Sequence, residues 1–278
     1  MTNKFRKLIA LLQSFGEYGA EYLNKKLFNK SLPVKPLHDD LYLVSFPKSG
    51  TTWLNFLMAN IHLRMSGSSQ LVTFYNINDF IPDIEYVRNL KANILTFPGY
   101  RVIKSHSEFN PFYNKVIYLI RDPRDIMVSY YYFLKNLGAF KEGLSQLIHS
   151  PRYGIRAWCR HVQGWVEKTP ASTSIDFLRY EDMKTEPGQV LTRIYNLLGH
   201  MIPEEVMAQA IQSSSFENMK KLETEYNYGG DFRFPGFEFV RKGKSGTYKE
   251  EISKEDLDFI TATAGPWLSR FGYSPSQE

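Results

Sequence analysis

Short apolar runs alternate along the chain with longer segments in which apolar residues recur at helical spacing. Four runs have the length of strands and an almost continuous apolar character, which is typical of strands buried on both faces of a sheet. They lie at residues 41–46, 100–106, 115–121 and 174–180. The helical patterns lie near residues 51–65, 123–137, 152–168 and 187–198. This order of elements predicts an α/β fold with a central parallel β-sheet flanked by helices.

The composition does not change abruptly along the 278 residues, of which 43% are hydrophobic. We therefore expect a single domain over residues 1–278, with its core at about 41–273 and a helical extension at 1–35. Within that extension, apolar residues at helical spacing lie beside basic residues. This helical face either packs on the core of the protein or makes a peripheral membrane contact.

Charge, hydropathy and cysteine content narrow the class of protein. The formal charge of +5 fits an anionic ligand or ordinary solubility, and it is too small to indicate a partner such as nucleic acid. No apolar run approaches the ~18 residues of a transmembrane segment, and the N-terminus lacks a signal-peptide cleavage pattern. Cys159 is the single cysteine, so no internal disulfide can form. We expect a cytoplasmic protein.

The stretch FPKSGTTW, residues 46–53, interrupts the first strand with small and basic residues. Gly50 lets the backbone approach a ligand closely, and the first turn of the next helix presents unpaired N–H groups. Lys48 adds a positive charge, and Ser49, Thr51 and Thr52 add hydroxyl donors. The pattern predicts a P-loop-like phosphate cradle, with Thr51 as a simple helix cap being the alternative. Because the lysine precedes the glycine, this is not a Walker A loop.

Two further segments carry basic residues, and in the first of them Arg121 and Ser129 could both reach one phosphate. In YLIRDPRDIMVSYYYF, residues 118–133, Arg121 ends a strand and Ser129 lies in the second turn of the following helix. The alternative for this segment is a helix start stabilised by salt bridges. The segment RKGKSGTYK, residues 241–249, would by itself be only a basic loop.

A third strand end places a candidate base near these loops. In VIKSHSEF, residues 102–109, the side chains of Lys104 and His106 lie on the same face because strands have a period of two. A histidine with a near-neutral pKa at the end of a buried strand is suited to general base catalysis, although a lone histidine is more often structural.

Together these motifs identify a family by resemblance. FPKSGTTW resembles the 5′-phosphosulfate loop of the soluble, cytosolic-type sulfotransferases, which use 3′-phosphoadenosine 5′-phosphosulfate (PAPS). The segments at 118–133 and 241–249 resemble the 3′-phosphate motifs of that family and occur in the family's order. The resemblance covers roughly residues 41 to 273, and it implies that PAPS is the cofactor, that PAP is the product and that no metal is needed.

The resemblance also assigns the cofactor site. It implies that Lys48, Ser49, Gly50, Thr51 and Thr52 hold the 5′-phosphosulfate. The 3′-phosphate would be bound by Arg121, Ser129, Arg241, Lys242 and Gly243. The adenine would be framed by Trp53, Tyr180 and Phe216, with Ser214 contacting the cofactor. Aromatic faces stack on any base, but packing in the core is the alternative for Phe216.

The chemistry implied by the resemblance is transfer of a sulfuryl group from PAPS to a hydroxyl or amine. His106 would take the proton of the acceptor, Lys48 would neutralise the leaving oxygen, and Lys104 would stabilise the sulfuryl oxygens. Ser129 would gate Lys48. The family continues after this histidine with an apolar residue and proline, whereas this chain has Ser107 and Glu108, which leaves the local acceptor contacts open.

The acceptor is not determined by these motifs. Phe80, Phe133 and Phe234 could line an apolar pocket for a phenol, a sterol-like molecule or another small hydrophobic alcohol. The RDPRD segment at 121–125 also resembles carbohydrate sulfotransferases, so a sugar or lipid acceptor stays open. The alternatives outside the family's activity are a nucleotide kinase and a catalytically weak PAP-binding protein.

The C-terminal part predicts how the protein assembles. In the cytosolic family a short segment after the glycine-rich motif joins two subunits, and its centre is a threonine-valine pair. The equivalent stretch, Lys249 to Asp258, has Ser253 and Lys254 at that centre. An exposed lysine there removes the central apolar contact, so we predict a monomer or a dimer through another surface.

Overall fold

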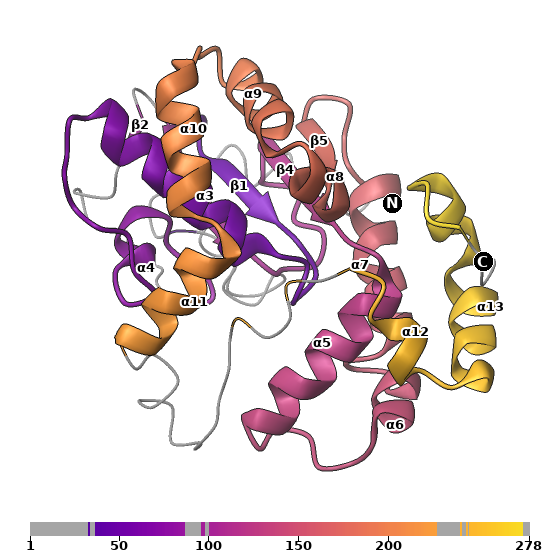
Figure 1. Cartoon of the computed structure of the whole chain (residues 1–278). Helices are drawn as coiled ribbons and strands as arrows, with labels where there is room; N and C mark the ends of the chain where they lie inside the picture. The colour runs from indigo at the N-terminus through magenta and orange to yellow at the C-terminus, as the bar shows by residue number, and fades with distance from the viewer. Residues whose placement is uncertain are drawn as a thin grey trace.

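A five-stranded sheet forms the centre of the protein (Figure 1). The computed structural model describes residues 33, 37–86, 96–97, 100–226, 240, 243 and 245–274. The strand order is β2-β3-β1-β4-β5. Their bounds are β1 (Leu41–Val44), β2 (Thr96–Phe97), β3 (Tyr100–Ser105), β4 (Lys115–Ile120) and β5 (Ser174–Arg179). The strands β3, β1, β4 and β5 are mutually parallel, as the sequence predicted, but β2 is an antiparallel edge strand, so the sheet is mixed.

The strand β1 lies between two parallel neighbours, with Leu43 opposite Lys104 on β3 and Ile117 on β4. All four of its residues are buried. Leu41 and Leu43 face one hydrophobic cluster, whereas Tyr42 and Val44 face the other. The continuous apolar run therefore reflects a strand covered on both faces, because alternate side chains enter opposite cores.

Helices cover both faces of the sheet (Figure 1). One cover consists of α3 (Thr51–Met65), α4 (Ile77–Phe80), α8 (Tyr180–Thr185), α9 (Pro187–Leu197), α10 (Glu204–Ser213) and α11 (Phe216–Glu225). The other consists of α5 (Pro123–Asn136), α6 (Leu144–His149), α7 (Ile155–Glu167), α12 (Tyr248–Glu251) and α13 (Lys254–Arg270). In the described part of the chain, no helix is long and apolar enough to cross a membrane.

The predicted helices correspond to α3, α5, α7 and α9, within three residues at each end. Each predicted strand is one or two residues too long at its carboxyl end, because the polar residues there belong to the following loop or helix. The N-terminal extension at 1–35, apart from residue 33, lies outside the described residues, as does most of the loop 226–246.

Candidate active site

The loop between β1 and α3 has the backbone conformation of a tight cradle. Gly50 has a φ of 98°, and Lys48 has a φ of 71°, which makes it the one non-glycine residue with positive φ in the described ranges. A Cβ atom at position 50 would overlap the ring of Tyr180, so glycine is required there. A strained lysine directly before a helix N-terminus is typical of a functional site, because the surrounding structure must impose that conformation.

Two of the predicted hydroxyl donors are used inside the loop itself. The Oγ of Ser49 donates to the carbonyl oxygen of Phe46 at 2.8 Å, and the hydroxyls of Thr51 and Ser45 are hydrogen-bonded to each other. Ser49 and Thr51 are buried, whereas Thr52 is half-buried. In this structure the hydroxyls of Ser49 and Thr51 hold the loop together, and their role as donors to a ligand stays a prediction.

Arg121 connects the phosphate loop to the end of β4. Its Nη1 donates to the carbonyl oxygen of Lys48 at 3.2 Å, and its guanidinium lies 4.4 Å from the centre of the Tyr180 ring. Its Nη2 is 4.0 Å from the carboxylate of Asp125. Ser129 follows in α5 and is half-buried. The two residues predicted to share a phosphate therefore come from the end of β4 and the helix that follows it.

Asp125 brings the third motif to the same edge of the sheet. Its carboxylate accepts hydrogen bonds from Gly246 N at 2.7 Å, Thr247 Oγ1 at 3.2 Å and Tyr248 N at 3.2 Å. The start of α5 is also stabilised by the pairing of Asp122 with Arg124 at 2.7 Å, as the alternative reading expected. Sequence reasoning did not assign Asp125 this role, because its partners lie more than a hundred residues away.

The aromatic residues predicted to frame the adenine lie around Gly50 and Gly243. The rings of Trp53 and Tyr180 meet edge to face at 5.9 Å. Phe216 is 38% exposed, so it is not a core residue, and its ring lies where a Cβ at Gly243 would be. Two glycines therefore allow two aromatic rings to approach the backbone, an arrangement that suits a bound nucleotide.

Ser214 is placed differently from the prediction. Its side chain is fully buried, and its Oγ accepts a hydrogen bond from Asn60 Nδ2 at 3.1 Å. Its carbonyl oxygen accepts the indole N–H of Trp53 at 2.8 Å. Ser214 thus holds Trp53 in position, and its hydroxyl is directed into the protein. Arg241 and Lys242 lie outside the described residues.

Lys184 is a basic residue of this region that sequence reasoning missed. It lies in α8, one turn after Tyr180, and its Nζ donates to the carbonyl oxygen of Gly243 at 2.7 Å. Partial burial and the nearby charge of Arg121 lower the pKa of Lys184. The spacing of four from Tyr180 was the available signal, since residues four apart share one helix face.

His106 follows β3 and lies beside the start of the phosphate loop. Its Nδ1 is 2.8 Å from the carbonyl oxygen of Ser45. A carbonyl can only accept, so Nδ1 carries the hydrogen and Nε2 keeps the lone pair. Burial and the charge of Lys104 lower the pKa of His106 to about 3. The sequence-based expectation of a near-neutral pKa is therefore wrong, because it did not account for burial.

Lys104 is paired in this structure. Its Nζ lies 2.7 Å from Asp83 Oδ2, with both side chains largely buried. The backbone strengthens the pairing, because Lys104 N donates to Pro82 O at 2.9 Å and Ile84 N donates to Lys104 O at 3.0 Å. Although burial opposes the shift, the ammonium of Lys104 lowers the pKa of Asp83.

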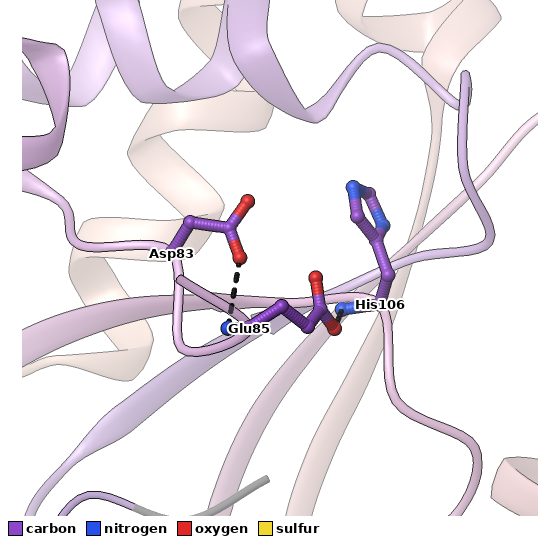
Figure 2. Close-up of side chains that lie close together, drawn as sticks. All are labelled: Asp83, Glu85 and His106. Atoms are coloured by element: carbon purple, nitrogen blue, oxygen red, sulfur yellow. Dashed lines mark hydrogen bonds between the residues drawn. The ribbon is translucent and has the colours of Figure 1, made fainter. Parts of the chain in front are cut away.

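Glu85 lies close to Asp83 and His106, as Figure 2 shows. Its Oε1 accepts the backbone N–H of His106 at 2.6 Å, and its own N–H donates to Asp83 Oδ1 at 3.1 Å. Although the residue as a whole is exposed, partial loss of hydration and the adjacent Asp83 carboxylate raise the pKa of its carboxyl to about 8. Glu85 is consequently mostly protonated at neutral pH.

Asp83, Glu85 and His106 are close enough to hold a metal ion, with ligand atoms within 4.8 Å of one another. No other such group exists in the part of the chain that the structure describes. The ammonium of Lys104 already neutralises Asp83 and would repel a second cation. The cluster therefore suits a proton-handling role better than a metal centre.

The predicted acceptor residues separate in the structure. Phe133 lies on α5, next to Tyr130, and the Nζ of Lys48 is 4.4 Å from its ring centre.

Phe80 is 5% exposed and packs into the core with Ile77, because both face inward from the short helix α4. The cavity beside it has a volume of about 20 Å³, room for a water molecule and not for an acceptor. The assignment of Phe80 is wrong, and Phe234 lies outside the described residues.

Comparison with known proteins identifies the family to which this chain belongs. Residues 38–272 match the family described as the sulfotransferase domain. This chain belongs to the sulfotransferase family. It is 31% identical to sulfotransferase 2A6 of Rattus norvegicus, with 77% of this chain and 79% of that protein covered. It is 28% identical to sulfotransferase 2A1 of Homo sapiens, with coverages of 79% and 82%.

Solved structures share the fold of this sulfotransferase. Mouse sulfotransferase SULT7A1, complexed with PAP, superposes with a TM-score of 0.61 at 21% identity, covering 87% of this chain and 91% of that one. Retinol dehydratase in complex with androsterone and PAP gives a TM-score of 0.62 at 20% identity, with coverages of 87% and 83%. As a sulfotransferase, the protein transfers a sulfuryl group from PAPS to an acceptor hydroxyl or amine and releases PAP. Membership of this family excludes the alternative that the protein is a nucleotide kinase.

Proposed function

We propose that the sulfotransferase acts on a small acceptor at the carboxyl ends of β1 and β3, with His106 as general base. The observation that carries this proposal is the position of Ser45. Its carbonyl oxygen holds Nδ1 of His106, and its hydroxyl is bonded to Thr51 at the start of α3. One residue therefore connects the candidate base to the phosphate loop, which fixes both at the same place.

The donor site would be formed by groups around that loop. Lys48, the first N–H groups of α3 and Arg121 would hold the phosphates, assisted by Ser129 and by residues 241–243. Trp53, Tyr180 and Phe216 would hold the adenine. The fit rests on the left-handed Lys48 and Gly50 and on the close approach of aromatic rings to Gly50 and Gly243. When bound there, PAPS supplies the activated sulfuryl group.

His106 would act through Nε2, because Nδ1 is committed to Ser45. An imidazole with a pKa lowered to about 3 stays neutral throughout the physiological range, so the base is always in its active form. Its weak basicity means that the proton moves late, as charge develops on the acceptor oxygen. Lys104 would stabilise the sulfuryl oxygens only after exchanging part of its contact with Asp83.

The acceptor would lie between the end of β3 and α5. Tyr130 and Phe133 stack at a ring separation of 6.5 Å and provide an apolar wall beside Lys48. Burial raises the pKa of Tyr130 to about 12, so its hydroxyl stays protonated at neutral pH. Such a space suits a small hydrophobic molecule with one hydroxyl, since aromatic walls bind the body of the molecule.

Two residues of the stretch that resembles the family's dimer segment, Ser253 and Lys254, lie at the start of α13. The hydroxyl of Ser253 accepts from Asp256 N at 3.2 Å and caps α13, and Lys254 is exposed in the first turn. This supports the proposal that the stretch 249–258 does not join two subunits. A cytoplasmic location and a possible membrane contact of residues 1–35 stay predictions.

An acceptor screen with radiolabelled PAPS tests the proposal. Substituted phenols, hydrophobic alcohols including sterols, arylamines and monosaccharides would each be offered to the wild-type protein and to His106→Ala. We expect sulfation of phenols or hydrophobic alcohols by the wild type only. Transfer to sugars alone would overturn the acceptor class, and equal transfer by His106→Ala would overturn the base.

A further inference from the structure

His161, in α7, occupies a buried position directly behind the candidate base. It is 3% exposed, and its Nε2 lies 3.2 Å from the carbonyl oxygen of His106. Its Nδ1 lies 2.7 Å from the hydroxyl of Tyr118 on β4. Because a carbonyl can only accept, Nε2 of His161 carries the hydrogen and Nδ1 accepts from Tyr118. Burial lowers the pKa of His161 to about 4, which keeps this neutral form at physiological pH.

The backbone of the segment after β3 is held at successive residues by the same helix. One turn after His161, Trp165 Nε1 donates to the carbonyl oxygen of Ser107 at 3.2 Å. Between them lies Gly164, where a Cβ would be only 3.1 Å from the Cβ of Phe109. A larger residue at position 164 would press this segment away from α7. The helix α7 therefore offers two donors and a flat surface to the segment that carries the base.

His106 is fixed through each of its hydrogen-bonding groups other than Nε2. Glu85 accepts from its backbone N–H, His161 donates to its carbonyl oxygen, and Ser45 accepts from its Nδ1. The ring of His161 also meets the ring of Phe46 edge to face at 5.8 Å, so it contacts the phosphate loop as well. Nε2 is the one nitrogen left to meet the acceptor.

We propose that His161, oriented by Tyr118, is a positioning residue that holds the base His106 in the place where the carbonyl of Ser45 fixes its Nδ1–H tautomer. The inference rests on the proposed role of His106 and adds a requirement for a donor at position 161. A base must lie within a hydrogen bond of the proton it removes, and a displacement of about 1 Å can reduce the rate ~100-fold. A donor that fixes the base therefore affects turnover without touching PAPS or the acceptor.

Variants at position 161 separate positioning from folding. His161→Leu removes the donor, whereas the amide nitrogen of His161→Gln reaches the place of Nε2 and can still donate to His106 O. Trp165→Phe is the matched control, because it removes a buried donor to the neighbouring carbonyl of Ser107. We expect kcat to fall about 10- to 100-fold in His161→Leu, with the KM for PAPS unchanged. The Gln variant should recover most of this loss, and Trp165→Phe should lose less than His161→Leu.

Acceptor acidity provides a readout that a purely structural role would not change. A strongly acidic phenol such as 4-nitrophenol needs little help from a base, whereas 4-methylphenol or an aliphatic alcohol needs more. The loss in His161→Leu should therefore increase as the acceptor becomes less acidic, in parallel with His106→Ala. A uniform loss for all acceptors, together with a lowered affinity for PAP, would show a merely structural effect and overturn the proposal.

A second measurement does not depend on any acceptor. The chain has six histidines, so ¹⁵N-histidine labelling with a His106→Gln reference spectrum identifies the ring of His106. We expect an Nδ1–H tautomer in the wild type and in His161→Gln, and a mixture of tautomers in His161→Leu. An unchanged tautomer in His161→Leu would contradict the inference. If His106→Ala kept its activity, the proposed base would fail instead, which distinguishes the two failures.

Discussion

The guanidinium of Arg121 donates a hydrogen bond to the carbonyl oxygen of Lys48 at 3.2 Å. The two residues lie 73 positions apart in the sequence, on the loop after β1 and at the end of β4. Because these strands are adjacent in the sheet, the residues proposed for the 5′ and the 3′ side of the cofactor hold each other. Substitutions at the two positions should nonetheless have different effects on binding and on turnover.

Replacing Lys48 with methionine should reduce turnover far more than PAPS affinity. A charge directed at the leaving oxygen matters most in the transition state, and loss of one such group typically costs ~10²–10³ in rate. Initial rates and PAP binding by calorimetry would measure the two effects separately. Lys135→Met is the matched control, because it makes the same change at an exposed lysine on α5. Wild-type turnover in Lys48→Met would refute the assigned role.

Replacing Arg121 with alanine should weaken binding of the cofactor and remove the preference for a 3′-phosphate. The guanidinium is buried beside the phosphate loop, so its loss would leave a phosphate without a charged partner. Competition between PAP and AMP for the protein gives the preference directly. A variant that still prefers PAP to the same degree would show that other residues read the 3′-phosphate.

His106→Ala should abolish sulfation of a weakly acidic alcohol, with a loss of ~10²–10⁴ in rate and nearly unchanged PAP binding. The pKa lowered to about 3 changes the expected pH dependence, because the imidazole stays unprotonated down to that value. Wild-type activity should therefore show no loss attributable to this histidine between pH 5 and pH 8. A decline with an apparent pKa near 6.5 that disappears in His106→Ala would contradict the structure.

Glu85→Gln should make the protein less sensitive to alkaline pH. The folded-state pKa of Glu85 is raised to about 8 from an ordinary value of 4.5, so the folded protein binds the extra proton between these values. Its contribution to the free energy of unfolding is complete below pH 4.5 and is lost as the pH rises through 8. Urea unfolding from pH 6 to pH 9 should show wild type losing stability relative to Glu85→Gln. Parallel curves would indicate an ordinary carboxyl.

The protein should not form a dimer through residues 249–258. Lys254 is exposed at the start of α13, and two copies of it across a two-fold axis would repel. Light scattering at micromolar concentration tests this for the wild type, and Lys254→Val tests whether an apolar residue creates the contact. A wild-type dimer that Lys254→Glu dissociates would contradict the prediction.

The sequence indicated the loop and the strands because their signals are local. Lys48, Gly50 and the helix start are adjacent in the chain, and each apolar run records burial on both faces. The pairing of Lys104 with Asp83 was not predictable, since it depends on a short segment that lies against the end of β3. The low pKa of His106 follows from burial, which no motif encodes. Phe80 was misassigned because the helix α4 is too short for its spacing to show which side faces inward.

Ser45 joins the candidate base His106 and the phosphate loop through its carbonyl and its hydroxyl, so a shift of one should displace the other. An enzyme built in this way has little freedom to accommodate a new acceptor by relocating its reactive groups. Divergence among related enzymes should therefore concentrate in the surrounding wall, at positions such as Tyr130 and Phe133, while the serine stays constant. Laboratory evolution toward new acceptors would find its useful substitutions in the same wall.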